Sequence, residues 1–219
     1  NPGTPAGSYS FDYQLCETLN PTNCKTATAS VTVDPSAIVA SNDSASAING
    51  ASGATAVANA FTSDLVNGVA ASPANASLSV KAGTTVPAGL TFDPATGSVD
   101  VAAGTPAGSY VIHYTLCETL NPANCQDATI TVEVIAAPVV ASSDSKTGIN
   151  GATGDPAALN LFTGDTINGA AATPANATLS LAPGASVPAQ LSFDPATGVV
   201  AVNPGTPAGS YSFDYQLCE

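Results

Sequence analysis

A strict internal repeat with a step of 101 residues constrains this chain more than any other feature. The heptapeptide GTPAGSY begins at Gly3, again at Gly104 and a third time at Gly205. Residues 1–17 also recur without change as residues 203–219, two steps further on. A unit of this length is too long for one coil of a solenoid and matches the size of a small globular domain. The sequence therefore predicts a tandem array of near-identical domains.

The repeat also predicts where the domains begin and end. Residues 1–34 are the C-terminal part of one repeat, residues 35–135 are a complete repeat, and residues 136–219 are a repeat that lacks its last strand. The joints fall near Asp34–Ala37 and Ile135–Pro138, so only a few residues connect one domain to the next. Because so short a joint restricts bending, we expect a semi-rigid array instead of domains on loose linkers.

The composition favours an all-β fold and excludes several classes of partner. Asp and Glu number 16 against 3 Lys and no Arg, which leaves a net charge of −13. Nucleic acids and anionic membrane surfaces are therefore not expected as partners, since both bind clustered Lys and Arg. No apolar run approaches the roughly 18–20 residues of a membrane-spanning helix. Turn residues about every ten positions, between stretches rich in Val and Thr, are typical of short strands.

Alternating apolar residues predict the best-defined strands of each repeat. In Tyr9–Leu15 every second residue is aromatic or aliphatic, and Tyr110–Leu116 keeps the same register one repeat later. This period of two indicates a strand with one buried face. A second alternating strand, Thr26–Val33, follows after a turn that contains Asn-Pro, which predicts a hairpin. The inward face is expected to form the structural core, with Tyr9, Phe11, Tyr13 and Leu15 in one copy and Tyr110, Ile112, Tyr114 and Leu116 in the next.

The cysteines flank the turn of this hairpin. Cys16 and Cys24 recur as Cys117 and Cys125, and Cys218 matches Cys16. A zinc site would need two further Cys or His ligands in each domain, and the only histidine of the chain does not recur. A disulfide in each repeat leaves nothing over and indicates an oxidising compartment. The partner of Cys218 is then expected beyond this stretch of sequence or in a neighbouring chain.

Turn motifs upstream of the hairpin complete the expected domain. Asn49-Gly50 and Asn67-Gly68, which recur as Asn150-Gly151 and Asn168-Gly169, are typical of tight hairpin turns with positive φ angles. A further strand is predicted at Ala76–Val80. Roughly six to eight short strands per repeat match a sandwich of two sheets. The predicted fold class is therefore all-β, a tandem array of immunoglobulin-like β-sandwich domains.

Two stretches resemble a known group of domains. VPAGLTFDPATGSVDVAAGTPAGSYVIHYTL, residues 86–116, is similar to the late strands of bacterial immunoglobulin-like and cadherin-like repeats of very large surface proteins. Residues 38–68 and 139–169 are similar to the openings of such domains. The resemblance implies a secreted, multi-domain protein of the adhesin or fibre type. It also implies that calcium at the domain joints must be considered, although this chain largely lacks the acidic clusters of the cadherin-like branch.

Four recurrent aspartates are the only calcium candidates. Asp43 recurs as Asp144, and Asp64 recurs as Asp165. Calcium takes six to eight oxygens, normally from several converging carboxylates. Single aspartates beside Ser, Gly and Pro more often form turns or cap strand ends, as is expected for Asp93 before its proline. We therefore predict no metal site and no cofactor, and keep the four residues as weak candidates.

Catalysis is not expected. His113 stands where the other copies have Asp12 and Asp214, on the polar face of its strand, so it is interpreted as a surface substitution. No Ser/His/Asp or Cys/His constellation recurs in every repeat, and acid–base or nucleophilic catalysis would need one. The sequence therefore predicts a protein that is not an enzyme.

The most consistent function is a structural extracellular fibre, stalk or sheath built of disulfide-clamped domains, located outside the cell or at its surface. The alternative is an adhesin region that binds glycans or a partner surface, with or without calcium to make it rigid. An adhesive array should vary at its loops, whereas ETLNPTN and ETLNPAN differ at one position, which favours the scaffold.

The expected partners are neighbouring repeats of the same protein, in one long chain or in a homopolymeric filament. In a filament, Cys218 would pair with Cys24 of an incoming strand from a neighbour. The strand Tyr9–Leu15 is present at both ends of the chain, and two copies that compete for one place argue against strand exchange. One long chain is therefore favoured.

Overall fold

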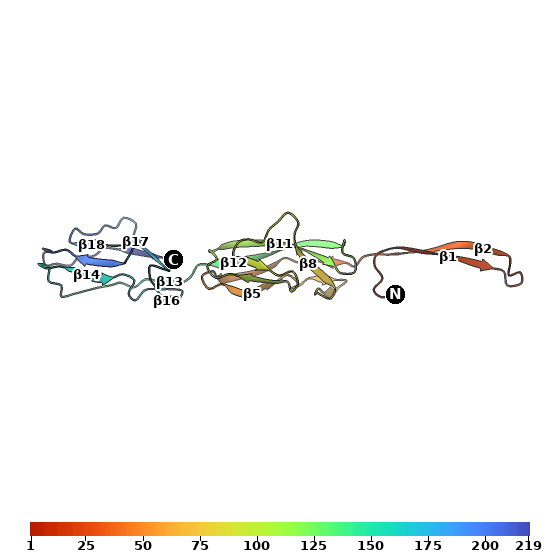
Figure 1. Cartoon of the computed structure of the whole chain (residues 1–219), viewed down its shortest axis with the longest axis horizontal. Helices are drawn as coiled ribbons and strands as arrows, with labels where there is room; N and C mark the ends of the chain where they lie inside the picture. Colours follow the sequence, from red (N-terminus) through yellow and green to blue (C-terminus); the bar gives the residue numbers. More distant parts are fainter. The chain divides into compact units, whose positions relative to one another are not determined.

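The computed structural model describes residues 1–219, and all of its regular structure is strand (Figure 1). The predicted all-β fold class is confirmed. The chain divides into two compact units, Asn1–Ile135 and Ala136–Glu219. The predicted domain limits, including the one at residue 34 inside the first unit, stay a prediction.

The first unit begins with a long two-stranded hairpin. Strands β1 (Gly7–Cys16) and β2 (Cys24–Val33) pair antiparallel along their whole length, from Gly7 opposite Val33 to Cys16 opposite Cys24. Both predicted strands are confirmed and each is slightly longer than its alternating pattern. No further strand is hydrogen-bonded to this sheet.

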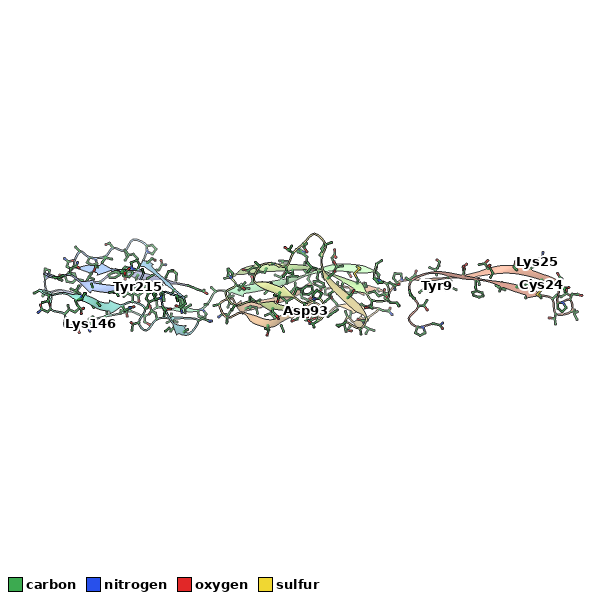
Figure 2. All side chains as sticks on the ribbon, in the orientation of Figure 1. Tyr9, Cys24, Lys25, Asp93, Lys146 and Tyr215 are labelled. Atoms are coloured by element: carbon green, nitrogen blue, oxygen red, sulfur yellow. A yellow bond between two sulfur atoms is a disulfide. The ribbon has the colours of Figure 1, made fainter.

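The predicted core face of β1 is wrong for this copy of the strand. Tyr9, Phe11, Tyr13 and Leu15 are 44%, 65%, 48% and 72% exposed. Figure 2 shows the side chains of the hairpin, Tyr9 among them, with no second sheet packed against them. The alternation is real, but burial also needs a covering layer, and the hairpin has none.

The rest of the first unit is a sandwich of two sheets, with a small third sheet. The larger sheet has the order β4 (Asp43–Asn49), β12 (Cys125–Ile135), β11 (Gly108–Glu118), β8 (Ala76–Val80). The facing sheet has the order β5 (Ala54–Asn59), β10 (Ser98–Val101), β9 (Leu90–Phe92). The small sheet has the order β3 (Ile38–Val39), β6 (Leu65–Val66), β7 (Val69–Ala70). The early strand β4 runs parallel to the last strand β12, and all other pairs are antiparallel, an immunoglobulin-like arrangement.

One core fills the space between the two larger sheets. Ile112, Tyr114 and Leu116 on β11 are completely buried, which confirms the core predicted for these three, while Tyr110 is half-buried. They pack with completely buried residues from β12 and β10, namely Ile130, Val132 and Val99. The same alternating pattern that is exposed in β1 is therefore buried in β11, because a facing sheet covers it.

The second unit repeats most of this arrangement. Its three sheets are β13 (Val139–Val140), β15 (Thr166–Ile167), β16 (Ala170–Ala171); β14 (Asp155–Asn160), β19 (Val199–Val202), β18 (Leu191–Phe193); and β17 (Thr178–Leu181), β20 (Tyr215–Cys218). It contains no counterpart of β12. Residues 144–150, which match β4, form no strand, because the ladder partner of β4 is β12.

Residues 35–135 hold ten strands, more than the roughly six to eight expected of a sandwich. Three of the ten, β3, β6 and β7, are two residues long and form the small sheet. Alternation cannot be recognised over two residues, so these strands were not predicted.

Two kinds of Asn-Gly pair differ in conformation. Asn67 and Gly68 have φ angles of 53° and 74° and connect β6 to β7, as predicted for a tight hairpin. Asn168 and Gly169 repeat this turn in the second unit with φ angles of 52° and 76°. For these two pairs the predicted turn is confirmed.

A turn does follow Asn49, where the N–H of Gly53 donates to the Asn49 carbonyl oxygen at 2.9 Å, but it is not the tight turn with positive φ angles that Asn49-Gly50 predicts. Neither residue has a positive φ angle, and Gly50 instead lies against the backbone of the loop before β11. Its carbonyl oxygen accepts hydrogen bonds from the N–H groups of Gly104 and Thr105 at 2.9 and 3.1 Å. A Cβ atom at this position would lie 2.0 Å from the carbonyl oxygen of Thr105. Glycine is required here for close approach of two backbones, and Gly151 repeats the contact in the second unit.

We expect Gly50→Ala to lower the free energy of unfolding of the first unit by at least about 2 kcal/mol, because the new methyl group forces two backbone segments apart. The measurement is chemical denaturation. Gly108→Ala is the matched control: its Cβ would meet only the Tyr110 ring, at 3.7 Å, an ordinary contact. A loss for Gly50→Ala no larger than for the control would contradict the close approach.

Candidate functional site at the hairpin neck and the domain entry

A disulfide closes the end of each complete hairpin. Cys16 pairs with Cys24 and Cys117 with Cys125, with S–S distances of 2.02 and 2.01 Å. In both hairpins the two cysteines are directly opposite in the strand register. A closed loop of this size stabilises the fold by roughly 2.5–3 kcal/mol in the chain-entropy model. Cys218 is a free, exposed thiol at the end of β20.

The glutamate that follows the first cysteine of each hairpin organises the tip. In the exposed hairpin, the Glu17 carboxylate accepts hydrogen bonds from the side chains of Asn20 and Asn23 at 2.7 and 3.0 Å. The hydrogen bond from Asn23, followed by that from Asn20, lowers the pKa of Glu17. All of these contacts are local to the tip.

In the sandwich the equivalent glutamate, Glu118, also binds a segment outside its own hairpin. Glu118 is buried, and its carboxylate accepts hydrogen bonds from the N–H and the Oγ of Ser36 at 3.2 and 2.8 Å and from Asn124 at 2.8 Å. Burial opposes its ionisation, but the hydrogen bonds, from Asn124 first and then from Asn121 and Ser36, outweigh this and lower the pKa of Glu118. Ser36 lies between β2 and β3, in the segment that enters the domain. Glu118 therefore fixes the domain entry to the neck of the last hairpin of the same domain.

The second unit repeats this anchor. Glu219 accepts a hydrogen bond from the N–H of Ala137 at 3.0 Å, with the same sequence separation of 82 residues as between Ser36 and Glu118. The entry segments are short: β2 ends at Val33 and β3 begins at Ile38, while β12 ends at Ile135 and β13 begins at Val139. In each domain the anchored entry residue, Ser36 or Ala137, therefore lies within a few residues of the end of the preceding strand.

One further contact in the first unit involves the repeated GTPAGSY loop. The N–H of Ala6 donates a hydrogen bond to the Asn121 side chain at 2.6 Å. Pro5 and Ala6 lie with Pro35, Leu120 and residues 121–124 around a common shallow depression. The loop before β1 therefore contacts the tip of the β11–β12 hairpin.

A polar cluster lies inside the sandwich, next to the short segment between β3 and β4. The hydroxyl oxygen of Tyr114 is 2.9 Å from the carbonyl oxygen of Ser41, 3.3 Å from Asp43 Oδ2 and 3.1 Å from Asp64 Oδ2. Asp64, which is almost completely buried, also accepts a hydrogen bond from the N–H of Ser41 at 2.6 Å. Asp43, Asp64 and Tyr114 are called the Tyr–Asp–Asp cluster below. It connects β4, the residue before β6, and β11.

The cluster recurs in the second unit as Asp144, Asp165 and Tyr215. The Tyr215 hydroxyl oxygen is 2.9 Å from the Ser142 carbonyl oxygen, 3.0 Å from Asp144 and 3.4 Å from Asp165. A tyrosine hydroxyl has one proton and can donate one hydrogen bond, whereas three acceptor oxygens surround it. A carboxyl group that retains its proton relieves this conflict by donating to a neighbouring oxygen.

The environment of the cluster favours such a retained proton. Burial, and next the charge of Asp64, raise the pKa of Asp43 from 3.8 to about 6, against a smaller opposing effect of the hydrogen bond from Tyr114. Burial also raises the pKa of Asp64, of Asp144 and of the two cluster tyrosines. The four calcium candidates are thus brought together in pairs, but each pair adds only one hydroxyl and one carbonyl oxygen to its carboxylates. These are at most six oxygens, one of which, Asp64 Oδ1, already accepts a hydrogen bond from the N–H of Ser41, and no third acidic side chain joins the pair.

Sequence reasoning placed these four aspartates in turns or strand ends and missed the cluster. The signal was present at Tyr114 and Tyr215, which hold an inward position of the alternating strand. A buried tyrosine hydroxyl needs a polar partner, and the recurrent aspartates are the polar groups that a core can offer it. The turn role predicted for Asp93 does appear, since its carboxylate accepts hydrogen bonds from Ala95 N and Thr96 Oγ1 at 2.9 and 2.7 Å.

The remaining titratable side chains of the chain do not gather into a site. His113 is exposed on the outer face of β11. No group of three or more His, Cys, Asp or Glu side chains lies close enough to hold a metal ion. The structure contains no helix with the length and hydrophobicity that a membrane span requires.

Comparison with known proteins returns structural likeness only. No family model matches the chain, and no curated protein matches its sequence. Domains 1–4 of protocadherin gamma B7 are 9% identical, with a TM-score of 0.36 over 89% of this chain and 48% of that one. Human cadherin-23 EC21–23 is 12% identical, with a TM-score of 0.36 over 91% of this chain and 65% of that one. Mouse cadherin-23 EC22–24 is 12% identical, with a TM-score of 0.34 over 88% and 63%.

The chain thus spans about half to two thirds of the length of these cadherin structures. Because their TM-scores are below 0.5, the strand order and the shared core described above carry the assignment of the fold.

We expect Glu118→Ala to lower the free energy of unfolding of the first unit by about 1–3 kcal/mol, because Ser36 and Asn124 lose a buried, charged acceptor. The chain contains its own control in Glu17→Ala, where the same residue is exposed and its contacts are local. This control should leave the free energy of unfolding nearly unchanged. Equal effects in denaturant titrations would show that Glu118 does not hold the domain entry.

The Tyr–Asp–Asp cluster predicts an inverted pH dependence. Because the pKa of Asp43 is raised to about 6, the folded state keeps a proton that the unfolded state releases near pH 4. The stability that accompanies this proton is present below the unfolded pKa and is lost as the pH rises through about 6. Asp43→Asn, which keeps the shape without the charge, should therefore raise the melting temperature at about pH 7.5 by a few degrees and change it little at about pH 4.

The difference between variant and parent at each pH isolates Asp43 from groups such as Glu118, whose lowered pKa acts in the opposite direction. Tyr114→Phe is the companion variant and should lower stability at both pH values. A melting-temperature difference for Asp43→Asn that is the same at both pH values would contradict the retained proton.

Proposed function

We propose that this chain is part of an extracellular structural array, a fibre, stalk or sheath in which repeated domains provide length and stiffness. Its partners are neighbouring repeats of the same protein, within one chain or between chains. It is not an enzyme, and it needs no cofactor. The two disulfides support an extracellular location.

The anchored domain entry is the observation that carries the proposal. Ser36 and Ala137 occupy equivalent entry segments, and each is held by the glutamate at the hairpin neck of its own domain. A short connection with one end fixed has few conformations, so successive repeats are restricted in how they bend. Stiffness is therefore set at both joints by equivalent pairs of residues, Ser36 with Glu118 and Ala137 with Glu219.

The roles of the residues that recur in each repeat support a structural scaffold over an adhesin. The residues that recur in each repeat hold entry segments, turns and hairpin necks together, as Glu118, Gly50 and the disulfide Cys117–Cys125 do. An adhesive surface would instead need exposed groups that converge on a ligand and vary between loops. A screen of glycans against the chain separates the two functions, since a specific glycan ligand would favour the adhesin.

Single-molecule pulling on the chain tests the mechanical role. The sandwich of the first unit should unfold in one discrete event, because its first and last long strands, β4 and β12, lie side by side. The disulfide withholds the residues between Cys117 and Cys125, a separation of 8, so reduction should lengthen the released contour by about 2–3 nm. Extension without a discrete unfolding event would argue against a structural role under load.

A further inference from the structure

The tip of the β11–β12 hairpin lies where one predicted repeat meets the next. The tip, residues 119–124, connects the two strands, and Glu118 at its base holds the entry residue Ser36. The same tip also contacts a segment that precedes the joint, because Asn121 accepts the hydrogen bond from the N–H of Ala6. The two partners are 115 residues apart in sequence. The contact therefore joins one repeat to the following one.

The side chain of Asn121 connects this contact to the anchored entry. Its oxygen Oδ1 accepts the hydrogen bond from Ala6 at 2.6 Å, and its amide group hydrogen-bonds to the carboxylate of Glu118. Glu118 in turn accepts the hydrogen bonds from the N–H and the hydroxyl of Ser36. A continuous line of hydrogen bonds thus runs from the preceding repeat, through the tip, to the entry segment.

The loop that carries Ala6 has the same local geometry in all three copies. Its first glycine has φ angles of 79°, 81° and 80° at Gly3, Gly104 and Gly205. In each copy the tyrosine that ends the loop donates a hydrogen bond to the carbonyl oxygen of the loop proline, at 2.8, 2.8 and 3.0 Å. The loop is therefore preformed, and contact with the tip costs it little conformational entropy.

The hairpin tip is also preformed. The N–H of Glu118 donates to the carbonyl oxygen of Asn124 at 3.0 Å, and the N–H of Asn124 donates to that of Asn121 at 2.8 Å. Residues 17–23 of the first hairpin repeat both hydrogen bonds at the same distances. Because the loop and the tip both have a fixed shape, few conformations are lost when they meet.

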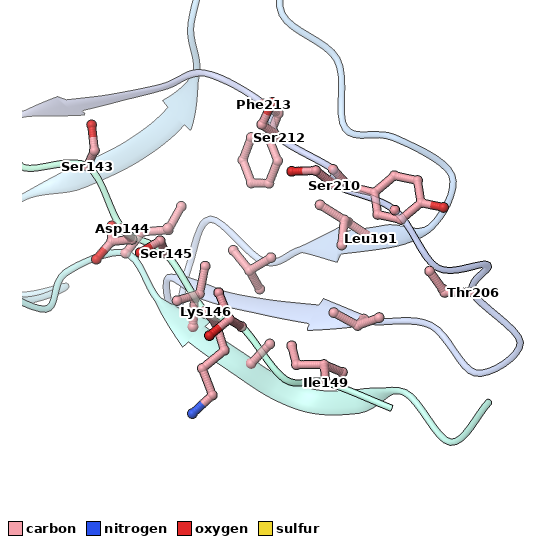
Figure 3. Close-up of a pocket in the computed structure, with 18 of the residues that line it drawn as sticks. Ser143, Asp144, Ser145, Lys146, Ile149, Leu191, Thr206, Ser210, Ser212 and Phe213 are labelled. Atoms are coloured by element: carbon pink, nitrogen blue, oxygen red, sulfur yellow. The ribbon is translucent and has the colours of Figure 1, made fainter. Parts of the chain in front are cut away.

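The sandwich does not use this loop surface itself. Residues 106–107, which match Pro5 and Ala6, are exposed on the complete domain of the first unit. In the third copy the same two positions are exposed between Thr206 and Ser210, both labelled in Figure 3. The loop is therefore presented to a neighbour by the domain that carries it.

Apolar side chains surround the hydrogen bond between Ala6 and Asn121. Pro5 of the loop, Pro35 of the joint and Leu120 of the tip line the same shallow depression. They come from both repeats and from the segment between them, so their contact removes apolar surface of all three from water.

We propose that the tip of the last hairpin of each repeat is a docking surface for the GTPAGSY loop of the preceding repeat, with Asn121 as its polar contact. This docking rests on the proposed function, and it identifies the surface through which neighbouring repeats meet. The bond between Ser36 and Glu118 fixes the entry segment at one point, about which the preceding repeat can still turn. A second attachment at Ala6 opposes that rotation. Both surfaces recur, since GTPAGSY is present three times and ETLNP twice.

Hydrogen exchange of single amides in the whole chain, followed by NMR, tests the docking. The N–H of Ala6 should exchange slowly in the parent chain, and Asn121→Ala, which removes its acceptor, should make this exchange at least about tenfold faster. Asn20→Ala is the matched control, because this equivalent asparagine bonds to Glu17 within its own tip. It should leave the exchange of Ala6 unchanged.

The amide of Ser36 separates the docking from the proposed function. Asn121→Ala should leave Ser36 protected, because Ser36 binds Glu118 directly, whereas Glu118→Ala should release it. If Glu118→Ala releases Ser36 while Asn121→Ala leaves Ala6 unchanged, the docking is wrong and the proposed function stands. If Ser36 stays protected in Glu118→Ala, the anchored entry is wrong, and the exchange of Ala6 then decides the docking by itself.

Backbone nitrogen relaxation gives a second measurement. In the parent chain the amides of β1 and β2 should have the same rotational correlation time as those of the sandwich in the first unit. In Asn121→Ala they should tumble faster, and in Asn20→Ala they should behave as in the parent chain. Independent tumbling of β1 and β2 in the parent chain, or unchanged tumbling in Asn121→Ala, would overturn the proposal.

Discussion

The parallel ladder between β4 and β12 is the contact on which the rest of the domain depends. It joins the start of a repeat to its end, with Asp43 opposite Ile130 and Asn49 opposite Ile135. Two further hydrogen bonds extend this ladder, called the seam below. Asn42 accepts a hydrogen bond from the N–H of Thr129, and Gly50 donates one to the carbonyl oxygen of Ile135. Because these residues are almost a whole repeat apart in sequence, the seam can form only when the complete sandwich is folded.

The second unit shows which parts of the domain are independent of that seam. Without a strand at the place of β12, residues 144–150 lose their ladder and Phe213 is only partly covered. The contacts of Tyr215 with Asp144 and of Glu219 with Ala137 remain. Polar contacts at the entry thus hold the ends of the repeat near one another, while apolar burial and strand pairing complete the sheet.

Three copies of one strand sequence lie in three environments. In β11 Ile112, Tyr114 and Leu116 are completely buried, in the third copy Phe213 and Tyr215 are half-buried, and in β1 the equivalent residues are exposed. The strand-forming pattern is the same each time, so the differences come from the number of neighbouring layers.

Local patterns in the chain were sufficient to predict the repeat, the all-β class, the strands β1, β2 and β8, and the pairing of Cys16 with Cys24 and of Cys117 with Cys125. Each of these depends on a short stretch of residues, on period-two alternation or on the ends of one hairpin. Contacts between distant residues decided the rest. They exposed Phe11 while its counterpart Ile112 was buried, brought Asp43 and Asp64 to the Tyr114 hydroxyl, and placed Gly50 at a close approach of two backbones instead of in a tight turn with positive φ angles. The physical reason is that alternation predicts which side chains share a face, whereas burial and buried hydrogen bonds depend on which segment of the fold covers that face.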